Sequence, residues 1–239
     1  MIMAKRNLKN ESKTSRHFKG ASADIQYKGT RDMAPLAPYI ISGGKNTERF
    51  YFQHISRNTD WHFNIYPQYF GGESNYITDF PKRIAQIQKN NADAKIYCVF
   101  DWDTIHDDKT CRKKHEDFEK SIKSKIDSGS VILCPSMPCF EYWFLLHFQN
   151  YRTLLRTCED VCKILEPHML PYFTNKKTRL IDIIKDQTFV GKDGWVKSLC
   201  ADGKLEQAID RAEKNIKKAE NEDELENQSY SYVYKLFKK

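Results

Sequence analysis

The sequence contains no apolar run long enough to cross a membrane. Its longest run, residues 142–148, is far shorter than the roughly 20 residues that a spanning helix needs. The N-terminal segment also has no apolar stretch of the kind that marks a signal peptide. We therefore expect a cytoplasmic protein with no membrane partner.

Cysteine is present, but it lacks the pattern of a disulfide framework. The chain has seven cysteines, an odd number, and no C-x-x-C pair. Several lie in apolar segments, as small core residues do. Cys158 and Cys162 are spaced to share one helix face, and with the nearby His168 they allow a zinc site as an alternative to a core role.

Net charge is also scarce outside the N-terminus. The chain carries 39 basic and 32 acidic residues, and eight of the basic but only three of the acidic residues fall within residues 1–32. The nearly neutral remainder does not indicate nucleic-acid binding by charge alone. We predict a flexible basic arm over residues 1–36, which acts either as a solubilising tail or as a phosphate-contacting arm.

The rest of the chain has enough apolar material, with 40% hydrophobic residues overall, for a sizeable core. Strand and helix patterns alternate over residues 37–136, which predicts an α/β core with a parallel sheet flanked by helices. The first and third strands can be neighbours in such a sheet, and we expect Pro135 to end the fourth strand. The predicted strands are residues 39–42, 61–66, 96–100 and 131–134, and the predicted helices are residues 46–58, 75–90 and 108–127.

Residues 137–239 are predicted to form a mostly helical C-terminal region packed on this core. Two segments carry the spacing of a buried helix face. Their apolar positions are Phe140, Trp143, Phe144, His147 and Phe148 in the first, and Leu205, Ala208, Ile209, Ala212, Ile216 and Ala219 in the second.

Two carboxylates follow the third predicted strand directly. Ligands of open α/β sheets bind at the carboxyl ends of the strands, where Asp101 and Asp103 lie. Side chains two apart in an extended chain point the same way, so we expect these carboxylates to converge. Converged carboxylates repel one another unless a cation lies between them, and their oxygens suit Mg²⁺ or Mn²⁺. Asp107 and Asp108 are expected to cap the next helix instead.

A glycine turn follows the first predicted strand. Backbone N–H groups at such a strand–turn–helix junction can bind an anion, so Gly43, Gly44 and Lys45 form a candidate phosphate site. The turn is not a Walker A loop. Glu48 in the first helical turn serves either the helix dipole or the same metal as Asp101.

These motifs, in this order, resemble the Toprim fold and, more closely, the RloB family of prokaryotic defence proteins. The family pattern has a strand followed by E-G-x-x-T-E, then D-x-D, then an N-P-x-F-E-x-W-x-L-L-H-F helix and an N-P-S-T-like segment near the C-terminus. The matching residues here are Gly44, Thr47, Glu48, Asp101, Asp103, Pro138, Phe140, Glu141, Trp143, Leu145, Leu146, His147 and Phe148, with Asn227, Gln228, Ser229 and Tyr230 resembling the last element.

Two positions depart from this pattern. Gly43 stands where the family has its first glutamate, which in Toprim enzymes is the expected metal ligand or general acid/base, and Met137 replaces the asparagine before Pro138. A glycine has no side chain to ligate a cation. Glu48 can compensate, because related Toprim nucleases use the second glutamate in binding a second metal.

Glu141 and His147 are the polar members of the distinctive helix block. A carboxylate inside an apolar run needs a partner, so Glu141 either forms a salt bridge or supports the metal site from behind. His147 is either a satisfied buried histidine or a second support for that site.

The leading hypothesis is a Toprim-type nuclease that cleaves DNA or RNA, tRNA included. The metal would be held by Asp101, Asp103 and Glu48. The resemblance implies anti-phage defence together with an ATPase partner. The alternative is a catalytically degenerate subunit that binds metal or nucleic acid beside that ATPase, and a third hypothesis is phosphoryl transfer on a nucleotide. The oligomeric state is not indicated.

Overall fold

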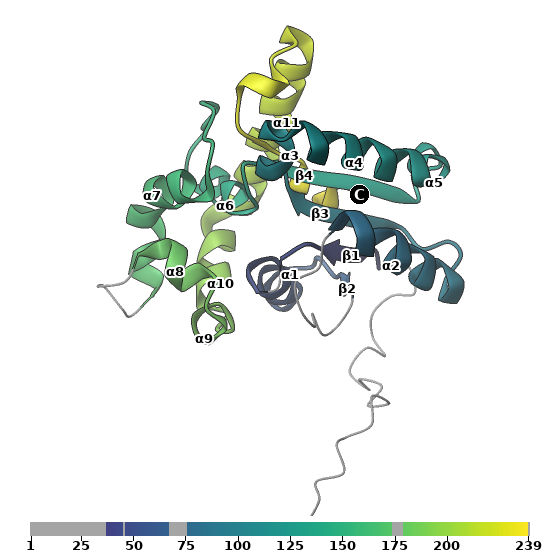
Figure 1. Ribbon diagram of the computed structural model, residues 1–239. Helices are drawn as coiled ribbons and strands as arrows, with labels where there is room; N and C mark the ends of the chain where they lie inside the picture. Colours follow the sequence, from purple (N-terminus) through teal and green to yellow (C-terminus); the bar gives the residue numbers. More distant parts are fainter. Residues whose placement is uncertain (1–36, 45, 67–75, 174–178, 239) are drawn as a thin grey trace, which may run out of the picture. The chain divides into compact units, whose positions relative to one another are not determined.

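The computed structural model describes residues 37–44, 46–66, 76–173 and 179–238 (Figure 1). The predicted arm and Lys45 lie outside these residues. The described part contains a five-stranded sheet with the order β2-β1-β3-β4-β5, which confirms the predicted α/β class. The strands are β1 (Tyr39–Ser42), β2 (Asn64–Ile65), β3 (Ile96–Asp101), β4 (Val131–Met137) and β5 (Tyr230–Ser231).

The first four strands run parallel, and β1 and β3 are neighbours, which the sequence left as a possibility. In the register, Ile41 lies beside Cys98, which lies beside Leu133. Strand β3 is central and apolar up to Asp101, as expected for a parallel strand covered on both faces. The carboxyl ends of β1, β3 and β4 therefore meet at one edge of the sheet.

Alternate residues of each strand enter two separate cores, one on each face of the sheet. Ile40, Tyr97 and Val99 belong to the larger core, whereas Ile41 and Cys98 belong to the smaller one. The helices and turns that line the larger core are α1 (Thr47–Asn58), α6 (Glu141–Phe148), α7 (Cys158–Met169), η2 (Leu170–Tyr172), α8 (Leu180–Ile184), α9 (Gln187–Val190), α10 (Gly194–Cys200), α11 (Lys204–Glu222) and η5 (Tyr232–Phe237).

The smaller core lies under helices that follow β2 and β3. Phe80, Ile84 and Phe118 are its main helical contributors. Its helices are α2 (Tyr76–Asn90), α3 (Asp103–Asp107), α4 (Lys109–Ser121) and α5 (Lys123–Asp127), and α2, α4 and α5 are seen together beside the sheet in Figure 1. Of the two predicted caps, Asp108 caps α4 by accepting from the N–H groups of Thr110 and Cys111, whereas Asp107 is the last residue of α3.

Several predicted bounds are wrong. Strand β2 has only two residues, and Phe63 before it packs in the larger core. The predicted helix over residues 108–127 is two helices, α4 and α5, with the break at the buried Ile122. Strand β4 continues through Pro135, because β5 pairs only with the two residues that follow it and no described strand needs an N–H from Pro135.

The C-terminal region is mostly helical, as predicted, but it also completes the sheet. Strand β5 pairs antiparallel with β4, and the hydroxyls of Ser136 and Ser231 are hydrogen-bonded at 2.8 Å. The remaining short helices are η3 (Ala201–Gly203) and η4 (Leu225–Asn227). Within the described residues there is no helix both long and apolar enough to cross a membrane.

Helix α6 is apolar on every side, which requires burial all round. The side chains from Tyr142 to Leu146 are fully buried, with 0% exposure each. The helix lies between α7 and α11 and begins directly after β4, so Glu141 is held at the carboxyl edge of the sheet.

Candidate acidic and thiol site at the carboxyl edge of the sheet

Three neighbouring parallel strands each lead into an acidic residue. Strand β1 leads through the glycine turn to Glu48, β3 ends on Asp101, and β4 leads into α6, which starts at Glu141. Glu48 and Glu141 are buried, with 6% and 4% exposure, while Asp101 is partly exposed. The topology therefore gathers carboxylates from three distant parts of the chain.

Glu48 folds back against the glycine turn. A Cβ atom at position 44 would overlap both carboxylate oxygens of Glu48, so the absence of a side chain at Gly44 is what makes room for them. Burial raises the pKa of Glu48 to about 7, although the backbone N–H groups of Glu48 and Gly44 donate to the carboxylate and act in the opposite direction. Gly44 thus forms a cradle for an acid that holds a proton near neutral pH.

Asp101 is fixed by the start of α6. Its Oδ1 accepts a hydrogen bond from the backbone N–H of Phe140 at 2.8 Å. Burial of the carboxylate raises the pKa of Asp101 well above its usual range, and the charges of Glu48 and Cys158 raise it further. The carboxylate of Asp101 therefore lies among negative charges that disfavour its ionised form.

Asp103 reaches the same region by a different route from the one predicted. The chain is not extended here, because Trp102 is helical in φ and ψ and Asp103 begins α3. The N–H of Asp103 donates to the carbonyl of Pro138 at 3.1 Å, and its carboxylate adds to the repulsion felt by Asp101. A tight turn, rather than strand pleating, places Asp103 beside Asp101.

Glu141 has thiols as neighbours. Cys158 Sγ lies 3.2 Å from Oε2 of Glu141, and Cys139 also interacts with this carboxylate. Burial raises the pKa of Glu141, and the charges of Cys158, Asp101 and Glu48 raise it further. Among the described residues, no lysine, arginine or histidine forms the salt bridge with Glu141 that was considered as an alternative.

The cysteines beside Glu141 differ in the direction in which their pKa values are shifted. Hydrogen bonds from Cys139 and then Cys162 lower the pKa of Cys158, whereas burial raises the pKa of Cys139. The predicted partner His168 is not part of this group. Its ring stacks on Phe148, with centroids 4.9 Å apart.

Lys185 is a site residue that sequence reasoning missed. Partial burial lowers its pKa, but the charges of Cys158, Glu141, Cys139 and Asp101 outweigh this, and the net effect is a raised pKa. Helix α1 positions this lysine, because Thr47 Oγ1 donates to the Ile184 carbonyl at 2.8 Å and Asn46 Nδ2 donates to the Lys185 carbonyl at 2.9 Å. No local pattern marks Lys185 as functional.

The predicted phosphate-binding turn is only partly described. Gly43 donates its N–H to the Val99 carbonyl, so this amide is used by the sheet. A Cβ atom at Gly43 would meet nothing within 4 Å, which leaves open space where the family has a glutamate. Lys45 lies outside the described residues, and its predicted role stays a prediction.

His147 is buried and bonded away from the carboxylates. Its Nδ1 lies 2.8 Å from the Leu199 carbonyl, and its Nε2 lies 3.5 Å from the Tyr51 hydroxyl. The Trp143 indole N–H donates to the same hydroxyl at 2.7 Å. These contacts indicate a structural histidine, and its predicted support of the metal site stays a prediction.

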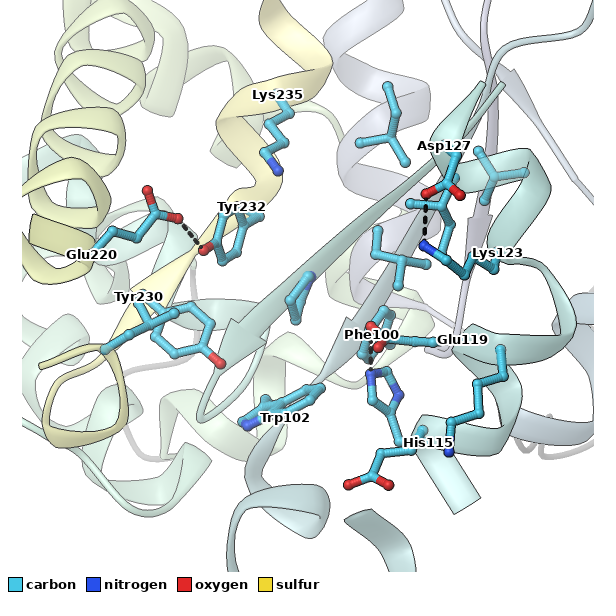
Figure 2. Close-up of a pocket in the computed structure, with 18 residues that line it drawn as sticks. Phe100, Trp102, His115, Glu119, Lys123, Asp127, Glu220, Tyr230, Tyr232 and Lys235 are labelled. Carbon is cyan, nitrogen blue, oxygen red and sulfur yellow. Dashed lines mark hydrogen bonds and ion pairs between the residues drawn. The ribbon is translucent and has the colours of Figure 1, made fainter. Parts of the chain in front are cut away.

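A separate cavity of about 830 Å³ lies over β3 and β4 (Figure 2). Trp102, Tyr230 and Tyr232 present rings to it, and Lys235 and Lys123 are among the residues around it. Glu116, Glu119, Asp127 and Glu220 also line it, so the lining has no basic excess. Trp102 lies between Asp101 and Asp103 in the chain, but none of the acids Glu48, Asp101, Asp103 and Glu141 lines the cavity.

The model of a family described as RloB-like protein matches residues 39–239. The match begins at β1 and includes every residue of the acidic and thiol site. Neither the curated proteins nor the solved structures contain a match to this chain.

Proposed function

The chain belongs to the RloB-like protein family, and from this membership and the acidic site we propose that it is a Mg²⁺-dependent nuclease acting in prokaryotic defence against phage. The observation that carries the proposal is the convergence of Glu48 and Asp101 from the ends of adjacent parallel strands, with Asp103 beside them. Toprim-type nucleases, which the sequence resembles, use carboxylates in this order.

The residues present fit a hard divalent cation. Carboxylate oxygens are the ligands that Mg²⁺ and Mn²⁺ prefer. Burial raises the pKa values of Glu48 and Asp101, and the charge of Glu48 raises the pKa of Asp101 further, so a cation in their midst would relieve an unfavourable arrangement. Gly44 supplies the space for the Glu48 carboxylate.

In the proposed mechanism, Asp101, Asp103 and Glu48 would hold the cation at the sheet edge. When bound, the cation supplies an activated water and neutralises charge on the scissile phosphodiester. The Phe140 N–H holds one oxygen of Asp101 in place. Burial raises the pKa of Glu48 to about 7 in the metal-free protein, so cation binding near neutral pH would displace a proton from this carboxyl. Lys185 adds positive charge beside the acids, where a phosphate would need it.

The proposed substrate is DNA or RNA, and family resemblance adds an ATPase partner protein. The basic arm over residues 1–32 would strengthen binding without sequence preference. Phosphate contacts of this kind weaken as salt increases. Deleting the arm should therefore reduce the salt dependence of binding while leaving the metal dependence of cleavage unchanged.

The deciding experiment compares the purified protein with Asp101→Asn. The amide oxygen of asparagine can still accept from the Phe140 N–H, so the fold is kept while a charged ligand is lost. We expect Mg²⁺- or Mn²⁺-dependent cleavage of tRNA, other RNA or DNA by the wild type, and a loss of at least about 100-fold in the variant. Asp93→Asn, in the exposed loop before β3, is the matched control. Equal cleavage by wild type and Asp101→Asn would refute the proposal.

A second candidate function is favoured by Gly43. Without the first family glutamate, the protein would serve as a metal- or nucleic-acid-binding subunit beside an ATPase. The open space at Gly43 allows the test, because Gly43→Glu meets no steric barrier at Cβ. Cleavage that appears only in Gly43→Glu, and not in Gly43→Ala, would show that the wild-type site is degenerate.

A further inference from the structure

Beside the carboxylates lies a compact group of softer ligands. Cys139 Sγ, Cys158 Sγ and a carboxylate oxygen of Glu141 all lie within 4.8 Å of one another. Cys139 and Glu141 are buried and Cys158 is half-buried. We propose that these three side chains bind a thiophilic divalent cation of the zinc class, at a site distinct from the Mg²⁺ site of Asp101 and Asp103.

The spacing suits a zinc ion without movement of the backbone. Zinc–sulfur bonds are about 2.3 Å and zinc–carboxylate bonds about 2.0–2.2 Å, so two thiolates on one tetrahedral ion lie roughly 3.8 Å apart. The three ligand atoms are already gathered within a slightly larger distance. Small rotations of the side chains would bring them to one ion.

Two rigid elements hold the ligands in place. Glu141 is the first residue of α6, and Cys139 is buried in the short turn that joins β4 to this helix. Cys158 is the first residue of α7, whose N-terminus is capped by the Thr157 hydroxyl accepting from the Asp160 N–H. Helices α6 and α7 pack against each other, so the site is part of the folded core rather than of a surface loop.

A fourth ligand is at hand one turn further along α7. Cys162 is buried, and its thiol is close enough to hydrogen-bond to Cys158. A structural zinc site has four protein ligands, whereas a site with three keeps one position for water or substrate. Cys162 would give the first arrangement, and its loss should convert the site to the second without abolishing binding.

The donor chemistry separates this site from the carboxylate site. Thiolates select zinc over Mg²⁺, because soft ligands bind hard cations poorly. The other buried cysteines differ in their surroundings. Cys134 lies in the larger apolar core and Cys98 in the smaller one. Among the described residues, neither belongs to a group of potential metal ligands. The sequence suggested zinc at Cys158 and Cys162 with His168, but the structure replaces His168 by Cys139 and Glu141.

The test uses the full chain, purified under reducing conditions and stripped with a chelator. Zinc is added, excess is removed by gel filtration, and bound metal is measured by mass spectrometry. We expect about one zinc ion per chain, and with Co²⁺ a thiolate-to-metal charge-transfer band. Cys158→Ser and Cys139→Ser should each weaken zinc binding at least about 10-fold and remove the band.

Two controls make the result specific. Cys200→Ser changes a half-buried cysteine outside the group and should leave zinc binding and the cobalt band unchanged. Asp103→Asn should impair nuclease activity and leave zinc bound, so failure of this proposal is distinguishable from failure of the nuclease proposal. Circular dichroism of the metal-free variants checks that they are folded.

Three results would overturn the proposal. The first is a wild-type protein that retains no zinc after gel filtration. The second is zinc binding that is equal in wild type and in the folded Cys139→Ser and Cys158→Ser variants. The third is a Cys139–Cys158 disulfide in the protein purified under reducing conditions, which would mean that these thiols pair with each other instead of with a metal.

Discussion

Acidification should destabilise this protein through His147. The ring is 1% exposed, and its contacts define a neutral tautomer in which Nδ1–H donates to the Leu199 carbonyl and Nε2 accepts from the Tyr51 hydroxyl. The Trp143 indole donates to that hydroxyl and directs its proton toward His147. A second proton, on Nε2, would point at the Tyr51 hydroxyl, whose own proton already points toward Nε2.

The pKa of His147 is lowered from 6.5 to about 4, mainly by burial and further by the charges of Arg211 and Lys204, although the Leu199 carbonyl acts in the opposite direction. Unfolding therefore takes up a proton between pH 4 and pH 6.5. The stabilising contribution is complete above the unfolded pKa and is lost as the pH falls. The full loss is about 3 kcal/mol below pH 4, a large part of a typical domain stability.

The assay is urea unfolding followed by tryptophan fluorescence at several pH values, for wild type and His147→Gln. Glutamine can donate to the Leu199 carbonyl but does not titrate. Other buried acids titrate in both proteins and cancel in the comparison. From pH 7 to about pH 5.5 we expect the wild type to lose about 1.3 kcal/mol more than His147→Gln. Identical pH dependence in the two proteins would refute the assignment of a buried neutral His147.

Three further predictions concern the site and the C-terminus. Gly44→Ala should displace the Glu48 carboxylate and lower cleavage at least about 10-fold. In the control Gly43→Ala the added Cβ meets nothing within 4 Å, so the fold and Glu48 should stay in place. Equal activity of the two variants would contradict the claim that Gly44 makes room for the Glu48 carboxylate. Burial raises the pKa values of Glu48 and Asp101, so Mn²⁺ must displace protons from these acids when it binds. Mn²⁺ affinity measured by calorimetry should therefore rise about tenfold per pH unit near neutrality, with release of protons. An affinity that does not change with pH would argue against these acids as ligands. The Phe237 ring is 4% exposed and stacks on Trp143. Phe237→Ala should therefore lower the free energy of unfolding in urea by about 3–5 kcal/mol. A change below about 1 kcal/mol would show that the C-terminal segment contributes little to stability.

The main features of the fold follow from local sequence patterns. Apolar runs of strand length and helices of the right period predict β1, β3 and their flanking helices, and the position of Asp101 at the end of a buried strand predicts the edge where the acids meet. The strands and helices themselves depend on neighbouring residues, whereas the meeting of the acids also requires the parallel pairing of β1, β3 and β4. The cap that Asp108 provides for α4 depends on neighbouring residues only.

Other features depend on how distant segments pack. Strand β5 consists of two residues, too short for any periodic signal, and exists because Tyr230 and Ser231 meet the free edge of β4. Lys185 enters the site because α1 and α8 are joined by side-chain hydrogen bonds to backbone carbonyls. Neither can be predicted from its own surroundings in the chain.

The sequence by itself determined a sheet with carboxylates at one edge. It also identified the residues concerned, which are Glu48, Asp101, Asp103 and Glu141. Only the tertiary structure decided which ligands become neighbours. Cys139, in the turn before α6, and Cys158, the first residue of α7, are 19 positions apart, and they meet with Glu141 because α6 packs against α7. Periodicity specifies which face of a helix is buried, but the identity of the opposing side chains is set by long-range packing, and the chemistry of a site depends on those opposing side chains.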